Sequence, residues 1–242
     1  MSESFTVLPL SPIRRMIAAR TAEAKQTIPH FRLREDIEVD AVVARRGAIE
    51  QGRGGRPEPG RGERLSLNDV LIKACADALV ATPALNLQWV DGELRHLHSV
   101  DISVVVALEE GLATPIVRRA EEKSVWEISR EIRALTVRAR QHALKIDEIL
   151  GGSFSVSNLG MYGVPEFDAI INPPKCAILA IGAARKCVVP GNGLGSRIAS
   201  LMRVTLSCDH RAIDGATGAA FLSALKLRLE DPEHLRRMTE AT

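Results

Sequence analysis

The sequence predicts a single α+β domain over residues 1–242, with a mostly central sheet and helices beside it. Segments with apolar residues at helical spacing occur together with short runs rich in β-branched residues. No stretch of linker composition divides the chain, and no internal repeat is visible. Hydrophobic residues make up 45% of the chain but aromatic residues only 3%. The core must therefore be built from alanine, valine, isoleucine and leucine.

The N-terminal part predicts a helix, a strand and a second helix. Segment 11–26 begins with a Ser-Pro pair suited to a helix N-terminus and carries apolar residues on one face. The helix should end before Pro29, because the residue before a proline avoids helical backbone. The alternating segment 30–40 then predicts a strand, and 41–51 predicts a helix.

Residues 51–63 form the one low-complexity stretch, with five glycines and two prolines. This composition predicts an exposed, mobile loop. Its arginines could contact an anionic partner, although a solvated loop is the more common role.

The middle of the chain predicts one helix and several short strands. Residues 65–69 should cap an apolar helix over 70–81. Segment 87–97 has an Asp-Gly turn between two alternating halves, which is typical of a hairpin. The β-branched run 100–108 predicts one continuous strand buried on both faces, and 109–117 predicts a turn into another strand.

The rest of the chain continues the same pattern. It predicts a long helix over 124–144, a short turn over 146–152, strands over 153–160, 176–184 and 197–210, and a last helix over 213–231.

Composition excludes several classes of function. A net charge of +2 gives no basis for bulk binding of nucleic acid, and the scarce aromatics leave few stacking platforms for single strands. No apolar run is long enough to span a bilayer, and the N-terminus lacks the pattern of a signal peptide, so we expect no membrane association and a cytoplasmic or mitochondrial-matrix location. The four cysteines have no metal-type spacing; buried free thiols and no metal are expected.

Two polar corners follow predicted strands. At the first, His210 can exchange a proton near neutral pH, and Asp214 starts the last helix, where it can cap the helix or pair with a cation. On spacing alone, a structural histidine beside a capping aspartate is the more common arrangement. At the second corner, Ser157 could be a nucleophile, a hydrogen-bond donor to an oxyanion, or a satisfied turn serine, and no G-x-S-x-G elbow surrounds it.

Longer motifs carry a resemblance to a known family. The segment SCDHRAIDGA, residues 207–216, resembles the active-site signature of the dihydrolipoamide acyltransferases, the core components of 2-oxoacid dehydrogenase complexes. IRRMIAARTAEAKQTIPHF, LSLNDVLIKA and GLATPIVRRAEEKSVWEIS resemble other parts of the same domain. GGSFSVSNLGMYGVPEFDAIINPPKCAILAIGAA is most similar to the acetyl-transferring, pyruvate-type branch. The resemblance extends from about residue 7 to residue 235.

The resemblance implies a fold and a mechanism. The fold would be like chloramphenicol acetyltransferase, the functional unit a homotrimer, and the active site a channel at each subunit interface. Acyl groups, here acetyl, would pass between a dihydrolipoyl thioester and coenzyme A, with His210 as general base and Ser157 as donor to the oxyanion. Asp214 would hold the corner around His210. Ser157 and His210 would meet across the interface.

The resemblance also implies residues that bind coenzyme A, which is a substrate here. These are Arg46, Ser66, Asn158 beside Ser157, and Gly182. Arg46 could contact a phosphate, Ser66 could donate a hydrogen bond to it, and Gly182 would allow close approach of the backbone. An exposed helix arginine is an equally good interpretation of Arg46.

The sequence departs from the family in two respects. No lipoyl domain and no peripheral-subunit-binding domain is present, so the lipoyl group is expected on a separate domain or chain, together with the other complex components. The chain would be either an excised core or a natural short form. The ending DPEHLRRMTEAT keeps Leu235 and Met238, but charges interrupt the apolar tail that links trimers in the family. A trimer is expected, with a cubic or dodecahedral shell in doubt.

Two other functions remain open at this point. One is a free-standing acetyltransferase that uses the same His210 on a small hydroxyl or amine acceptor. The other is a scaffold without activity, although the presence of His210, Asp214 and Ser157 together argues against it.

Overall fold

The computed structural model describes residues 5–52, 64–108, 111–191, 193 and 195–240. The predicted loop over 51–63 therefore lies, from residue 53 onward, outside the described residues. The helices are α1 (Pro12–Thr27), α2 (Asp40–Gly52), α3 (Leu67–Ala81), α4 (Val125–Arg140), α5 (Gly215–Glu230) and α6 (Pro232–Glu240). The strands are β1 (His30–Glu38), β2 (Leu87–Val90), β3 (Glu93–His96), β4 (Ile102–Val104), β5 (Val106–Leu108), β6 (Gly111–Ala113), β7 (Ile116–Val117), β8 (Phe154–Asn158), β9 (Ala177–Pro190) and β10 (Ser196–Asp209).

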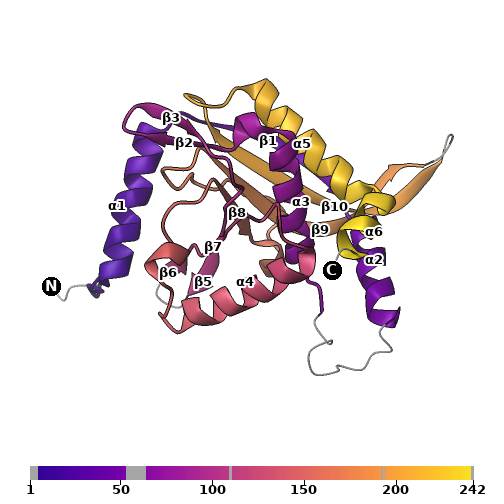
Figure 1. Ribbon diagram of the computed structural model, residues 1–242, viewed down its shortest axis with the longest axis horizontal. Coiled ribbons are helices and arrows are strands. Elements are labelled where there is room, and N and C mark those ends of the chain that lie inside the picture. Colours follow the sequence, from indigo (N-terminus) through magenta and orange to yellow (C-terminus); the bar gives the residue numbers. More distant parts are fainter. Residues whose placement is uncertain (1–4, 53–63, 109–110, 192, 194, 241–242) are drawn as a thin grey trace.

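A mixed six-stranded sheet forms the centre of the molecule, which confirms the predicted α+β class (Figure 1). Its order is β1-β10-β9-β8-β4-β7, and the pairs β9–β8 and β8–β4 are parallel whereas the other three pairs are antiparallel. Two small hairpins, β2–β3 and β5–β6, stand outside this sheet. The β2–β3 turn has positive φ at both Asp91 and Gly92, as the Asp-Gly signal predicts.

The two faces of the sheet are covered differently. Helices α3, α4 and α5 lie together over one face (Figure 1). Their apolar side chains pack on inward residues such as Phe154, Leu179 and Leu206 in the main core. The other face carries a small second core, where Ile178 and Ala180 meet α1 and the segment around residues 167–171. The first half of β9, Ala177–Ile181, is therefore buried on both faces.

Helix starts follow the local signals in the sequence. The hydroxyls of Ser11, Ser66 and Ser124 accept backbone N–H groups at the starts of α1, α3 and α4. Such caps satisfy donors that have no partner inside the helix, at about 1 kcal/mol each. None of the described helices is both long enough and apolar enough to cross a bilayer.

One predicted strand is wrong. The run 100–108 forms two strands, β4 and β5, that belong to different sheets. β4 is buried between β8 and β7, but the chain then leaves the sheet, and β5 pairs with β6 instead. The β-branched composition is the same on both sides of this break, so the sequence pattern does not mark it.

The C-terminal segment is a helix, α6, which the sequence analysis did not predict. Leu235 and Met238 lie in the core of this same chain, at 0% and 6% exposed. The apolar residues that resemble a protruding tail are thus already covered by the subunit to which they belong.

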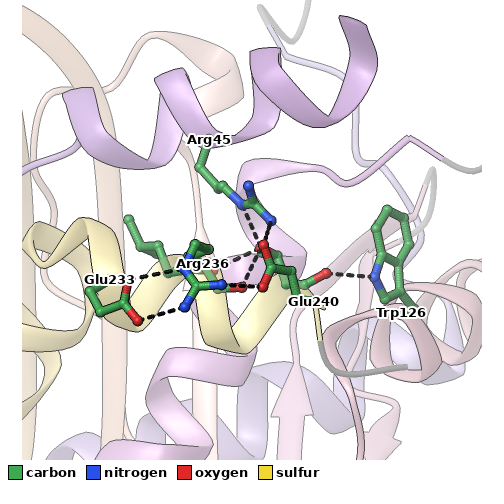
Figure 2. Close-up of polar contacts among 7 residues, drawn as sticks. Arg45, Trp126, Glu233, Arg236 and Glu240 are labelled. Atoms are coloured by element: carbon green, nitrogen blue, oxygen red, sulfur yellow. Dashed lines mark hydrogen bonds and ion pairs between the residues drawn. The ribbon is translucent and has the colours of Figure 1, made fainter. Parts of the chain in front are cut away.

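Polar contacts hold α6 in this place (Figure 2). The indole N–H of Trp126 donates to the carbonyl of Thr239 at 3.1 Å, and Arg45 donates to the Thr239 hydroxyl at 2.7 Å. On the outer side of the helix, Arg236 pairs with both Glu233 and Glu240, at 2.7 and 2.6 Å. The charged residues Arg236 and Glu240, which interrupt the apolar tail, therefore form ion pairs on the exposed face of α6.

Candidate active site

His210 lies directly after β10, at a corner fixed by hydrogen bonds from both sides. Its backbone N–H donates to the carbonyl of Pro29 at 3.1 Å, and its ring lies 4.5 Å from the ring of Phe31. The side chain is exposed. The backbone therefore anchors the residue while the imidazole stays accessible for proton transfer.

The residues beside His210 form an ion pair between a buried aspartate and an exposed arginine, which sequence reasoning did not single out. The Asp209 carboxylate, 1% exposed, accepts the Nε and Nη2 groups of Arg211 at 2.9 and 2.7 Å and also the backbone N–H of Arg211. The Arg211 guanidinium lies over the Trp89 ring, 4.7 Å from its centroid. The only indication of this pair in the sequence is that both charged residues occur in the segment that resembles the family motif.

Asp214 caps helix α5, which is one of the two roles expected for it. Its carboxylate accepts the backbone N–H of Thr217 at 2.7 Å. This hydrogen bond, with the charge of His210 as a smaller contribution, holds the pKa of Asp214 below its ordinary value. Asp214 is thus a charged group that shapes the corner, and its oxygen contacts the helix rather than the imidazole.

Ser157 lies near the end of β8 and faces the smaller core. It is 8% exposed, and no side-chain hydrogen bond joins it to another described residue. A buried hydroxyl in this state is available to donate to an incoming group. The contacts among the described residues thus favour the two alternatives in which the hydroxyl acts on a substrate over a satisfied turn serine.

The strand register separates Ser157 from His210 within one chain. Ser157 is opposite Ala180, which is opposite Thr205 on β10. His210 is five residues beyond Thr205, so the two site residues are roughly 16 Å apart along the strands and about 10 Å apart across them. A single subunit cannot bring them to one reacting atom.

The four candidate residues for coenzyme A gather around the start of α3. Arg46 donates to the carbonyl of Leu65 at 2.7 Å, next to Ser66. The amide of Asn158 donates to the side chain of Asn68 on α3 at 3.2 Å. Asn158 also accepts the backbone N–H of Gly160, which lies against the carbonyl of Gly182. Residues from four distant segments thus form one cluster.

The structure shows why residue 182 is a glycine, which the sequence alone does not reveal. A Cβ at this position would lie 2.0 Å from the carbonyl oxygen of Pro165, and the neighbouring Ala183 N–H donates to the Val164 carbonyl at 2.8 Å. The close backbone approach at Gly182 is therefore to this chain's own segment 164–165.

Replacing Gly182 with alanine is expected to lower the free energy of unfolding by about 3 kcal/mol, because neither backbone can move away cheaply. Urea unfolding measures this change. Gly47→Ala in α2 is the matched control, since nothing lies within 4 Å of a Cβ there. It should leave stability unchanged or raise it by up to about 1 kcal/mol. Equal stabilities of the two variants would contradict the packing argument.

An apolar cavity of about 430 Å³ opens beside the strand that carries Ser157. Its wall includes Ile13 and Ile17 of α1, Val105, and Ser155, which lies two residues before Ser157 on the same face of β8. The cavity is large enough for a flexible hydrocarbon segment.

Burial disfavours a nucleophilic role for three of the four cysteines. The four thiols are free, as expected; Cys75, Cys176 and Cys208 are buried and Cys187 is half-buried. Burial raises the pKa of Cys176 and of Cys208 to about 12, although Cys208 is only two residues from His210. Within the described residues, no group of three or more His, Cys, Asp or Glu side chains is placed to hold a metal ion.

Comparison with known proteins extends over nearly the whole chain. The model of the family "2-oxoacid dehydrogenases acyltransferase (catalytic domain)" matches residues 2–236. The chain is 43% identical over 230 residues to the dihydrolipoyllysine-residue acetyltransferase component of the pyruvate dehydrogenase complex of Rickettsia bellii. The match covers 95% of this chain but 54% of that protein, so this chain spans about half the length of such relatives.

Solved structures agree with this match. A dihydrolipoamide acetyltransferase of Azotobacter vinelandii, studied for the role of a serine, a histidine and an asparagine in its catalytic mechanism, has a TM-score of 0.89 at 27% identity over 96% of this chain and 94% of that one. The cubic core of a pyruvate dehydrogenase multienzyme complex also gives 0.89, at 27% identity, covering 97% and 95%.

The predicted likeness to chloramphenicol acetyltransferase is confirmed for the fold, with a TM-score of 0.53 at 14% identity over 88% of this chain and 94% of that one. The family match is independent of this distant likeness, since it extends along the sequence from residue 2 to residue 236. The chain therefore belongs to the 2-oxoacid dehydrogenase acyltransferase family, of which it carries the catalytic domain.

Proposed function

We propose that this protein transfers acetyl groups between a dihydrolipoyl thioester and coenzyme A. The observation that carries the proposal is that the chain presents an exposed histidine on a fixed corner and, on another strand, a buried serine hydroxyl with no partner among the described residues, and is 43% identical to an acetyltransferase of this kind. The histidine supplies proton transfer, and the serine supplies a donor for a developing negative charge.

The mechanism assigns proton transfer to His210 and stabilisation of the oxyanion to Ser157. His210 takes the proton of the coenzyme A thiol, and the thiolate attacks the carbonyl carbon of the acetyl thioester. Ser157 donates a hydrogen bond to the oxyanion of the tetrahedral intermediate. The intermediate collapses, the bond to the lipoyl sulfur breaks, and His210 returns the proton to that sulfur. Both substrates are bound together, so no acyl-enzyme forms.

Asp214 contributes geometry and charge. In the Azotobacter vinelandii enzyme, the histidine and the asparagine of its catalytic mechanism are four residues apart, as His210 and Asp214 are here. An aspartate at that position keeps the helix cap and places a negative charge beside the corner that carries His210.

The active site is assembled between subunits of a homotrimer. His210 of one subunit acts with Ser157 of its neighbour, because the register keeps the two residues of one chain far apart. Coenzyme A lies along the cluster of Arg46, Ser66 and Asn158. The apolar cavity beside Ser155 takes the hydrocarbon part of the lipoyl arm, which arrives on a separate domain or chain.

The proposed activity is consistent with the complexes to which the relatives belong. They are components of pyruvate dehydrogenase complexes, and the partners proposed here are a lipoyl carrier and the other components of such a complex. The compartment is the bacterial cytoplasm or the mitochondrial matrix.

The substrate is tested by comparing transfer rates from acetyl-, isobutyryl- and succinyl-dihydrolipoamide to coenzyme A. The acetyl compound should react fastest. Small hydroxyl and amine acceptors are tested in parallel with acetyl-coenzyme A. Faster transfer to one of these than to dihydrolipoamide would favour a free-standing acetyltransferase, and no transfer in any reaction would favour a scaffold.

The protein should sediment as a trimer of about 79 kDa, three times the chain mass of 26.3 kDa, in analytical ultracentrifugation. A related structure forms a cubic core, but here Leu235 and Met238 are buried in their own subunit, and ion-paired charges cover the outer face of α6. A particle of 24 or 60 subunits would contradict this proposal.

A further inference from the structure

A second cavity of about 390 Å³ lies next to the corner that carries His210 and shares Arg20, Asn172 and Pro173 with the lining of the first cavity. Its lining combines charged and polar side chains with apolar ones. Arg20 and Thr27 contribute from α1, Lys175 from the segment before β9, and Arg211 from the corner itself. Neither the proposed proton transfer nor the proposed coenzyme A cluster uses Arg20 or Lys175.

Lys175 is a buried cation with a single hydrogen-bond partner. It is 3% exposed, and its ammonium donates to the carbonyl of Gly151 at 3.1 Å. An ammonium has three donors, so this contact leaves two. Burial, with the positive charges of Arg118 and Arg20, lowers the pKa of Lys175 to about 8. No carboxylate pairs with Lys175 among the described residues.

The carboxylates nearby have other partners or lie at the rim. Asp209 forms its bidentate pair with Arg211, and Asp101 pairs with Arg118 at 2.7 Å. Glu23 lines the cavity from α1 but is exposed, and it forms no ion pair with a described residue. Among the described residues, therefore, neither Lys175 nor Arg20 is ion-paired with a carboxylate, and Glu23 is the one unpaired acid of the lining.

Arg20 provides the second cation from the opposite wall. It is exposed, and no ion pair joins it to another described residue. A guanidinium offers a planar fork of donors that matches a carboxylate or a phosphate, while a lysine supplies a point charge. Thr27 and Asn172, which also line the cavity, add neutral polar groups.

We propose that Lys175 and Arg20 form a binding site for a small oxyanion, a carboxylate or a phosphate group, beside the His210 corner. The anion would accept hydrogen bonds from the free donors of Lys175 and from the Arg20 fork. It would thereby supply the counter-charge that the buried ammonium lacks.

Thermal unfolding of the full chain tests the site, with sodium phosphate and sodium succinate titrated separately against sodium chloride at equal ionic strength. A ligand that binds only the folded protein raises Tm with a saturable dependence on concentration. We expect saturation with at least one of the two anions and none with chloride. The anion with the lower half-saturation concentration identifies the phosphate or the carboxylate class.

Three variants complete the test, each compared with its own Tm without anion. Lys175→Met should abolish the saturable rise, and Arg20→Gln, an exposed change that leaves folding intact, should raise the half-saturation concentration at least tenfold. Lys145→Met removes the same charge from an exposed lysine outside the cavity and should behave as the wild type. No saturation with either anion, or equal rises in all variants, would overturn the proposal. Because the readout is binding, loss of acetyl transfer alone would leave it unaffected.

Discussion

His210→Ala is expected to lower kcat for acetyl transfer between acetyl-coenzyme A and dihydrolipoamide by roughly 10³-fold, since general acid–base catalysis contributes about 10² to 10⁴. Without the imidazole, the dihydrolipoamide thiol that attacks acetyl-coenzyme A must lose its proton to water, and little thiolate is present at neutral pH. The fold should survive, because the corner is anchored through the backbone N–H of residue 210 and through the Asp209–Arg211 pair. Steady-state kinetics and the circular dichroism spectrum measure the two effects.

His96→Ala is the control for this variant. His96 is exposed on β3, in the small hairpin outside the central sheet, so its loss should leave the rate unchanged. Sedimentation should give a trimer for both variants. If His210→Ala kept nearly full activity, the proton-transfer mechanism would be wrong, and if it lost the trimer, the rate would carry no information about catalysis.

Ser157→Ala is expected to lower kcat by about 10² to 10³ with little change in KM for coenzyme A, because the lost donor acts on the oxyanion of the transition state. The ground-state thioester carries no such charge. Stability should change little, since the Ser157 hydroxyl has no described partner to lose.

Ser103→Ala is a closely matched control for Ser157→Ala. Ser103 lies on β4, the strand beside β8, is fully buried, and its hydroxyl also has no partner among the described residues, but it does not line the cavity assigned to the lipoyl arm. Its removal should leave kcat close to the wild-type value. Mass spectrometry after incubation with acetyl-coenzyme A should find no acetyl group on Ser157. A stable acetyl-serine would contradict the role of Ser157 as a donor and support a nucleophile.

Local features of the fold were predictable from the sequence. The capping serines, the Asp-Gly hairpin and the last strand before His210 each depend on residues that are close together in the chain. The break between β4 and β5 was not predictable, because it depends on which strands the chain pairs with far along the sequence. Helix α6 was missed because it has only a short apolar stripe, Leu235 and Met238, which resembles an interrupted tail. Only the fold shows that this stripe packs into the main core of the same chain.

The candidate site was predictable to a similar degree. The family resemblance singled out His210, Ser157 and Asp214, but the ion pair of Asp209 and Arg211 over Trp89 involves a segment more than a hundred residues away. The reason for Gly182 was also hidden, because it depends on the carbonyl of Pro165. The cluster around α3 joins residues whose proximity no local pattern encodes.

Coexpression of the Ser157→Ala and His210→Ala chains tests the central claim, that each active site combines residues of two subunits. With random mixing in a cyclic trimer, about a quarter of the interfaces would join an intact Ser157 to an intact His210. The mixture should therefore recover about a quarter of the wild-type acetyl transfer rate, although each variant alone is nearly inactive. Activity no higher than that of the single variants, in trimers shown by mass spectrometry to contain both chains, would contradict the claim.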